Sequence, residues 1–261
     1  MTDPRIPPPH LRSRAPRPPD SAVRVAAVVT ARGDSERLRG KHTADVCGFP
    51  LLHYPLRAAR EAETVDTVAI ASDSEEIVAL GYHHGADTAY QIPSEHTRAC
   101  STQAEALAWT VSRLDADTAG ALEIVVCLLG NTVMVDGALI DRAVRALDAD
   151  GAATSVLSVW RAEDDHPLRA MELTPQGILV PFAGGSSPSY SDTRRYPAAY
   201  YHDQGVWVCR TPNFYRLDGL PPWTWAGQRP AAIVRPWWAG RDVDDAHDLA
   251  LARLWVREGL G

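Results

Sequence analysis

Short runs of β-branched and small apolar residues recur along this chain, and segments with helical periodicity separate them. The first run is VRVAAVVT at residues 23–30, and the strongest is EIVVCLL at residues 123–129. Continuous apolar runs of this length are typical of strands that are buried on both faces. Strands that alternate with helices pack most economically as one sheet covered on both sides. The sequence therefore predicts a three-layer, mostly parallel, Rossmann-like α/β fold.

The same periodicities predict the individual elements. We expect strands at residues 23–30, 67–71, 87–91, 123–129, 153–160, 205–210 and 231–237. We expect helices at residues 50–63, 74–84, 101–114, 136–147 and 244–258. Residues 164–204 interrupt the alternation with a hairpin around Gln176 and Gly177, followed by a polar loop rich in Gly, Ser and Pro. This segment, called the excursion below, is expected to leave the sheet.

Length and charge narrow the class of protein. The 261 residues are enough for one large domain, and we assign it to residues 23–261, because residues 1–22 are rich in Pro and Arg and are expected to form a disordered leader. The net charge of -7 argues against partners that are polyanionic, so we expect neither nucleic acid nor a membrane surface. No apolar run approaches the roughly 20 residues that span a bilayer. A cytoplasmic enzyme is the expectation.

The loop ARGDSERLRGKH at residues 31–42 follows the first strand, at the sheet edge where α/β folds bind ligands. Its glycines allow main-chain N–H groups to approach a phosphate, and its four cations suit a triphosphate. A solvated, charged turn is the alternative interpretation. The spacing of Gly33 and Gly40 does not match a P-loop. The candidate nucleotide-binding residues are Ala31, Arg32, Gly33, Ser35, Arg37, Arg39 and Lys41, with Asp73 after the next strand.

A second cluster, RDVDDAHD at residues 241–248, follows the last strand. Asp242 and Asp244 flank Val243, so in an extended segment both carboxylates lie on one side, where they could hold Mg²⁺ through oxygen ligands. Helix capping is the competing explanation, and it is the preferred one for Asp245 and Asp248. Asp242 is harder to explain as a cap.

Four segments together resemble the acylneuraminate cytidylyltransferase family, whose members make CMP-activated nonulosonic acids. They are VVTARGDSERLRGKH, GFPLLHYPLRAA, IASDSEEI and DVDDAHDLALA, in the family's order along residues 23–257. The resemblance implies a nucleotidyltransferase sheet in which Arg32 and Lys41 bind the CTP phosphates and Asp73 lies near the nucleotide. It also implies that Asp242 and Asp244 carry the metal, and that the excursion contributes to a homodimer and to the neighbour's acceptor site.

The chain departs from the family pattern at two motifs. In the first loop, Asp34, Glu36 and Arg39 stand where the family has Gly, Lys and Pro. After the 123–129 strand, the family usually has Q-P-T-S-P-L-R, whose Gln touches the acceptor sugar, whereas this chain has Leu129 and then GNTVMV. Asn131 and Thr132 still offer hydrogen bonds there. The changed motif makes ordinary N-acetylneuraminate a poor candidate for the acceptor.

Further acceptor-binding candidates lie at the end of the excursion. The polar residues His202, Asp203 and Gln204 precede the strand expected at 205–210, where the family lines its acceptor site, although a hairpin surface is an equal possibility. Arg195 could hold an acceptor carboxylate or phosphonate through two hydrogen bonds, or it could be solvated.

Magnesium-dependent transfer of CMP from CTP to a small acidic sugar, with release of pyrophosphate, is the function that these features favour. The candidate catalytic residues are Arg32, Lys41, Asp242 and Asp244. Three alternatives stay open. The acceptor could be a 3-deoxy-sugar acid or a small phosphonate, or the protein could bind nucleotide without turnover, as Glu36 and the missing Gln would allow. A glycosyltransferase is a weaker alternative. Its metal-binding D-x-D motif would be expected after a middle strand, whereas the pair in this chain lies near the C-terminus.

Overall fold

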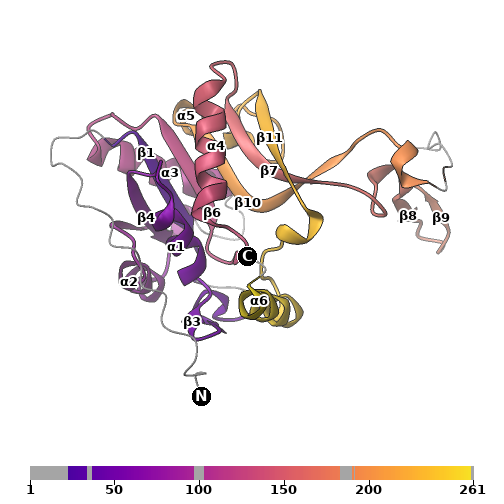
Figure 1. Cartoon of the computed structure of the whole chain (residues 1–261), viewed down its shortest axis with the longest axis horizontal. Coiled ribbons are helices and arrows are strands. Elements are labelled where there is room, and N and C mark those ends of the chain that lie inside the picture. Colours follow the sequence, from indigo (N-terminus) through magenta and orange to yellow (C-terminus); the bar gives the residue numbers. More distant parts are fainter. Residues whose placement is uncertain (1–22, 34–36, 97–102, 183–189, 191, 260–261) are drawn as a thin grey trace.

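The computed structural model describes residues 23–33, 37–96, 103–182, 190 and 192–259 (Figure 1). The predicted leader at residues 1–22 and the nucleotide-binding candidate Ser35 lie outside the described residues. Within the described residues, no helix is long and apolar enough to cross a membrane.

One seven-stranded sheet forms the centre of the protein, in the order β11-β7-β10-β6-β1-β4-β5. Only β10 runs antiparallel to its neighbours, and the other pairings in this sheet are parallel. The predicted mostly parallel α/β fold is therefore confirmed. The strands are β1 (Val25–Thr30), β4 (Thr67–Ser72), β5 (Thr88–Gln91), β6 (Ile124–Leu129), β7 (Ser155–Arg161), β10 (Tyr200–Arg210) and β11 (Pro230–Arg235).

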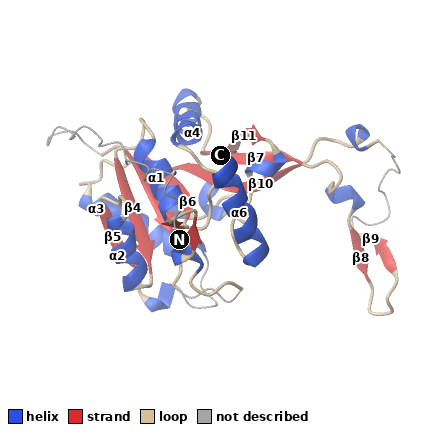
Figure 2. Ribbon diagram, turned by 60° about the horizontal axis from the view of Figure 1, so that its bottom comes forward, coloured by secondary structure: helices blue, strands red, loops and turns tan. Residues whose placement is uncertain are grey.

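Helices cover both faces of the sheet, which gives the three predicted layers (Figure 2). The helices α1 (His53–Glu61), α2 (Glu75–His83) and α4 (Gly137–Ala149) pack on the face that carries Val25, Ala27 and Val29. The helices α3 (Gln103–Asp117) and α5 (Pro212–Arg216) cover the opposite face. Alternate residues of β1 thus enter different cores, as the continuous apolar run predicts.

A third apolar cluster lies apart from these two cores. The helix α6 (Ala246–Glu258) packs there against the hairpin of β2 (Asp45–Val46) and β3 (Phe49–Pro50) and against Val133 and Met134. This cluster joins the chain's last helix to the loops that follow β1 and β6.

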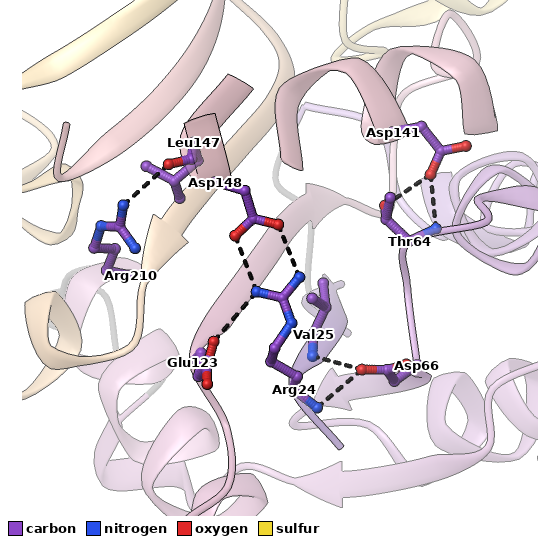
Figure 3. Close-up of polar contacts among 9 residues, drawn as sticks. All are labelled: Arg24, Val25, Thr64, Asp66, Glu123, Asp141, Leu147, Asp148 and Arg210. Atoms are coloured by element: carbon purple, nitrogen blue, oxygen red, sulfur yellow. Dashed lines mark hydrogen bonds and ion pairs between the residues drawn. The ribbon is translucent and has the colours of Figure 1, made fainter. Parts of the chain in front are cut away.

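Charged side chains fix the amino edge of the sheet (Figure 3). Arg24 binds Asp148 through two hydrogen bonds of 2.9 and 2.8 Å, and Asp66 accepts the main-chain N–H groups of Arg24 and Val25. Hydrogen bonds to Arg24 hold the pKa of Asp148 below its usual range. Polar connections therefore gather at this edge, and the opposite, carboxyl edge is where β1, β4 and β6 open into the candidate site.

Some element boundaries differ from the sequence-based expectation. The last strand ends at Arg235 rather than at residue 237, because Pro236 cannot donate to the ladder and Trp237–Ala239 forms a 3-10 turn. The last helix begins at Ala246, since Asp245 caps it in a capping box with Asp248. The predicted capping role of Asp245 and Asp248 is thus confirmed.

The excursion is a separate arm on one side of the sheet. Figures 1 and 2 both show it reaching away from the sheet between β7 and β10. It carries the predicted hairpin, formed by β8 (Met171–Leu173) and β9 (Leu179–Pro181), with Gly177 at a positive φ of 79° in its turn. Residues 200–204 belong to β10, so the expectation that they precede the strand was wrong; a bulge lets this polar stretch continue the pairing.

Candidate active site at the carboxyl edge of the sheet

Three loops converge where β1, β4 and β6 end. The Ala31 N–H donates to Ala71 O at 3.1 Å, and the Gly130 N–H donates to Thr30 O at 2.8 Å, so the first residues of the loops stay in register with the strands. The Gly33 N–H then donates to the Asp73 carboxylate at 2.7 Å. A Cβ at residue 33 would overlap the Cβ of Ser74, so this close approach requires glycine. The structure thus brings Asp73 to the predicted phosphate loop.

The loop's cations meet the second acidic cluster. Lys41 Nζ lies 3.0 Å from one carboxylate oxygen of Asp244, and Arg37 contacts the other. The Lys41 side chain is 15% exposed, whereas that of Arg37 is 70% exposed, so Lys41 is the more firmly fixed of the two. Arg32 and Arg39 are exposed on the same loop. Residues about 200 positions apart in the chain therefore form one charged site at the sheet edge.

Asn131 links the two predicted metal carboxylates. Its side-chain amide donates to Val243 O at 2.9 Å and lies 3.3 Å from a carboxylate oxygen of Asp242 and 3.5 Å from one of Asp244. Both carboxylates therefore lie on the same side of the segment, as their alternation around Val243 predicts. Burial raises the pKa of Asp242, and the negative charge of Asp244 raises it further. The hydrogen bond from Asn131 and the positive charge of Lys41 offset part of this rise.

The two carboxylates suit Mg²⁺ better than a metal that is held by protein ligands alone. Hard carboxylate oxygens are the ligands that Mg²⁺ prefers, and Mg²⁺ commonly takes only one or two of them, with water and substrate phosphates completing its shell. Among the described residues, no group of three or more His, Cys, Asp or Glu side chains could hold a metal. Asp242 and Asp244 offer two such carboxylates on one side of their segment.

The residues predicted to bind the acceptor occupy different surroundings. Asn131 and Thr132 are 5% and 2% exposed, and the Thr132 hydroxyl donates to Leu129 O. Thr132 also forms a β-bridge with Asp242. The Asn131 side chain and the Thr132 main chain therefore build the carboxylate site from within, which is a different position from the open strand tip that the sequence suggested.

The His202 to Gln204 cluster is divided by the bulge of β10. The His202 ring stacks on Trp207, with ring centroids 4.0 Å apart, and burial lowers its pKa to about 4. Its Nε2 is buried without a hydrogen-bond partner in the part of the chain that the structure describes. Asp203 points elsewhere, into a buried ion pair with Arg235 at 3.0 Å, while Gln204 takes a positive φ of 59°. The other ring nitrogen, Nδ1, accepts the Gln204 N–H at 2.9 Å, so of the two nitrogens of His202 one is buried and the other is hydrogen-bonded.

Arg195 lies on the excursion, in a 3-10 turn (Thr193–Arg195). Its guanidinium stacks over the Tyr190 ring at 4.4 Å. Figure 1 shows the excursion turned away from the carboxyl edge of the same chain. A role for Arg195 in acceptor binding would therefore concern the site of a second copy.

Sequence reasoning missed two residues beside the site. His42 is 4% exposed behind the loop, and burial lowers its pKa to about 4. A Cβ on Gly130 would come within 3.0 Å of the His42 ring, so the ring packs directly under the turn after β6. Arg235, 10% exposed, holds the segment before Asp242. The sequence carries only a weak signal for them: His42 is a polar residue close to a glycine, and Arg235 is a polar residue at the end of an apolar strand.

An open α/β sheet with a cationic loop and paired carboxylates at one edge is the arrangement of a nucleotide-binding transferase. A family model described as "Cytidylyltransferase" matches residues 26–173, more than half of the chain. The chain belongs to the cytidylyltransferase family.

Relatives with known names agree with this family. The chain is 28% identical over 255 residues to a 3-deoxy-manno-octulosonate cytidylyltransferase of Brucella anthropi, covering 91% of this chain and 98% of the relative. It is 26% identical over 184 residues to a Helicobacter pylori protein named pseudaminic acid cytidylyltransferase and UDP-2,4-diacetamido-2,4,6-trideoxy-beta-L-altropyranose hydrolase, covering 70% of this chain and 34% of that protein.

Solved structures share the fold. A CMP:2-keto-3-deoxy-manno-octonic acid synthetase complexed with CTP superposes with a TM-score of 0.65 at 17% identity, covering 90% of this chain and 99% of that one. A 4-diphosphocytidyl-2C-methyl-D-erythritol synthase from Anaerococcus prevotii gives 0.63 at 12% identity, covering 90% and 96%. The predicted nucleotidyltransferase fold is confirmed.

Proposed function

We propose that this protein transfers CMP from CTP to a small acidic sugar and releases pyrophosphate, with Mg²⁺ bound at Asp242 and Asp244. The observation that carries the proposal is the meeting of this carboxylate pair with Lys41 at the sheet edge, in a chain of the cytidylyltransferase family. Names of the relatives support an acidic sugar acceptor. The reaction would use cytoplasmic CTP.

The acceptor is better described as a 3-deoxy-sugar acid or a related nonulosonic acid than as N-acetylneuraminate itself. A relative whose match spans 91% of this chain is named for 3-deoxy-manno-octulosonate. Leu129 stands where the acylneuraminate pattern has its acceptor Gln, and an apolar side chain cannot replace that hydrogen bond. Pseudaminic acid is the second candidate for the acceptor, because the name of the Helicobacter pylori relative includes it.

Binding of the triphosphate would use the loop that follows β1. The main-chain N–H groups around Gly33 and the side chains of Arg32, Arg37, Arg39 and Lys41 would neutralise phosphate charge. Lys41 and Arg37 are paired with Asp244 in the structure, so they would exchange that partner, wholly or in part, for phosphate oxygens. Asp73 would hold the loop's turn through the Gly33 N–H.

Transfer itself asks the protein mainly for position and charge. The acceptor oxygen attacks the α-phosphate in line, the bond to the β-phosphate breaks, and pyrophosphate leaves. Bound Mg²⁺ supplies charge neutralisation and a lower pKa for the acceptor hydroxyl. Asp242 and Asp244 would hold it, and Asn131 would keep the two carboxylates aligned through its amide.

The test is pyrophosphate release from each of the four NTPs with Mg²⁺, against a panel of 3-deoxy-octulosonate, nonulosonic acids and small phosphonates. We expect release with CTP and one acceptor. Asp242→Asn and Asp244→Asn should each lower the rate by about 100-fold or more, because metal charge stabilisation is worth several kcal/mol. Asp245→Asn is the matched control, since Asn caps a helix as well as Asp does and should keep full activity.

Other outcomes separate the alternatives. Activity that survives both Asp242→Asn and Asp244→Asn would exclude the metal assignment. CTP binding by calorimetry without pyrophosphate under any acceptor would instead favour a nucleotide-binding protein without turnover. Failure to bind any nucleotide would contradict the proposed reaction as a whole.

The protein is also proposed to act as a homodimer through the excursion. Four large apolar side chains on its hairpin are exposed by 60 to 70%: Leu173, Ile178, Leu179 and Phe182. An exposed apolar cluster of this kind marks an interaction surface. A second copy of the chain would cover it and would bring Arg195 towards the neighbour's acceptor site.

A further inference from the structure

A buried polar cluster lies beside the carboxylate site without belonging to it. The Arg235 guanidinium binds the Asp203 carboxylate at 3.0 Å, and the two side chains are 10% and 0% exposed. Asp203 also accepts the Ser158 hydroxyl and, at 2.8 Å, the Gly205 N–H. All four residues lie on neighbouring strands β7, β10 and β11, so the guanidinium is held from the sheet side.

The rest of the guanidinium reaches the two segments that carry the site. Nη1 binds Asp203, and the other terminal nitrogen, Nη2, donates both to Met134 O and to Ala239 O, the latter at 2.8 Å. Met134 lies three residues after Asn131, and Ala239 lies three residues before Asp242. Arg235 thus ties the loop after β6 to the segment before the carboxylates.

Those two segments meet again at the site itself. The Val243 N–H donates to Asn131 O at 2.8 Å, and Thr132 and Asp242 form a β-bridge. The short loops between this bridge and the Arg235 contacts have no strand ladder of their own. Besides the apolar packing of Met134 and Ala239 in the third cluster, the bridge at one end and the guanidinium at the other hold these loops together.

The cluster has little room for adjustment. A Cβ on Gly240 would overlap the Cβ of Asp203, and a Cβ on Gly205 would overlap the Arg235 guanidinium. Both glycines therefore allow the ion pair to pack directly against the main chain. Burying an ion pair costs desolvation free energy, so a buried pair is weak evidence that it stabilises the fold. The role of this pair is better explained by the geometry that it imposes.

We propose that Arg235, held by Asp203, is a positioning residue that sets the spacing of the Asp242 and Asp244 carboxylates relative to Asn131. The proposal rests on the proposed metal-dependent function of that pair. Partners that orient metal ligands from outside the ligand shell typically change metal affinity or activity by about 10- to 100-fold when they are lost. Lysine keeps the charge of Arg235 but cannot bond Asp203 and two carbonyls in one plane.

Arg210 provides a matched control at the other end of β10. Its guanidinium also binds main-chain carbonyls, but at the amino edge of the sheet. It donates to Leu147 O at 3.0 Å (Figure 3) and to Ala153 O at 2.9 Å. Arg210→Lys should therefore cost stability of the same kind without affecting the carboxylate pair. Asp203→Asn is a second test variant, which removes the charge that holds Arg235 and leaves its bonds to the carbonyls available.

The experiment compares Arg235→Lys, Asp203→Asn and Arg210→Lys with the unmodified chain. Mn²⁺ binding in the presence of CTP is followed by electron paramagnetic resonance, and amide exchange of residues 240–245 by mass spectrometry. We expect the Mn²⁺ dissociation constant to rise at least about tenfold in Arg235→Lys, less in Asp203→Asn and not in Arg210→Lys. Exchange should accelerate around Val243 in the first two variants only.

Each result can be separated from the fate of the proposed reaction. If Arg235→Lys is destabilised to urea as much as Arg210→Lys but keeps both Mn²⁺ affinity and slow exchange at Val243, the positioning role is overturned. If the unmodified chain binds Mn²⁺ with CTP but turns over no acceptor, the transferase proposal fails, while loss of binding in Arg235→Lys still supports positioning. Absence of Mn²⁺ binding in the unmodified chain would overturn both.

Discussion

Acidification is expected to destabilise this fold through its buried histidines. Burial lowers the pKa of His42, His53 and His202 from 6.5 to about 4 in each case. The folded rings therefore stay neutral between pH 6.5 and 4, whereas the same rings in the unfolded chain gain a proton. The unfolded state binds more protons over this range, so the free energy of unfolding falls as the pH falls. Well above pH 6.5 the rings are neutral in both states, and this effect disappears.

The magnitude follows from the size of the shift. Between pH 7 and pH 5, a ring whose pKa falls from 6.5 to about 4 on folding removes about 1.8 kcal/mol from the free energy of unfolding. The shifts of the other two rings act in the same direction, so the total loss is a large part of the stability of an ordinary domain.

The assay is urea unfolding of the unmodified chain and of His42→Asn at both pH values. The substitution removes one titrating ring, so the loss of stability between pH 7 and 5 should shrink by about 1.8 kcal/mol, whatever the variant's absolute stability. His247→Asn, at an exposed position on α6, is the control and should keep the full loss. Equal losses in His42→Asn and the unmodified chain would refute the claim that the folded ring excludes the proton.

Two further predictions concern packing and assembly. Gly240→Ala should destabilise the chain by about 1–3 kcal/mol in urea unfolding, because its Cβ would overlap Asp203, whereas Gly151→Ala meets no atom within 4 Å and should change stability little. Leu179→Asp should convert a dimer to a monomer in sedimentation velocity, whereas Tyr82→Asp, on the exposed surface of α2, should not. A monomeric unmodified chain at micromolar concentration would contradict the proposed dimer.

The sequence predicted the sheet well because its signal is local. The β1 and β6 runs are apolar on both faces, and Ser74 and Asp136 cap the helices that follow their strands by accepting main-chain N–H groups of Ile77 and Leu139. The sequence does not indicate where a strand ends if polar residues continue its ladder, as at residues 200–204. There the bulge of β10, with Gln204 at a positive φ, lets the chain pair without an apolar pattern.

The site was predicted in part for the same reason. The alternation of Asp242 and Asp244 around Val243 is a local pattern, and their shared side was correctly expected. The contact of Lys41 with Asp244 spans 203 residues, and that of Asn131 with Asp242 spans 111. No periodicity reports contacts at such separations, so the resemblance to a family was needed to group these motifs.

The different placement of Asn131 and Thr132 shows what local reasoning lacks. From the sequence alone, polar residues at the end of a buried strand are expected to face a ligand. In the structure the chain after β11 returns along this strand end, and its main chain and carboxylates use the same polar groups. Buried polar groups must find partners, and a returning segment is as good a partner as a substrate. Arg235 follows the same logic, since its hydrogen bonds go to two carbonyls that a turn and a loop leave unpaired. Residues that build a site from within therefore become visible only when the segments that they join are known.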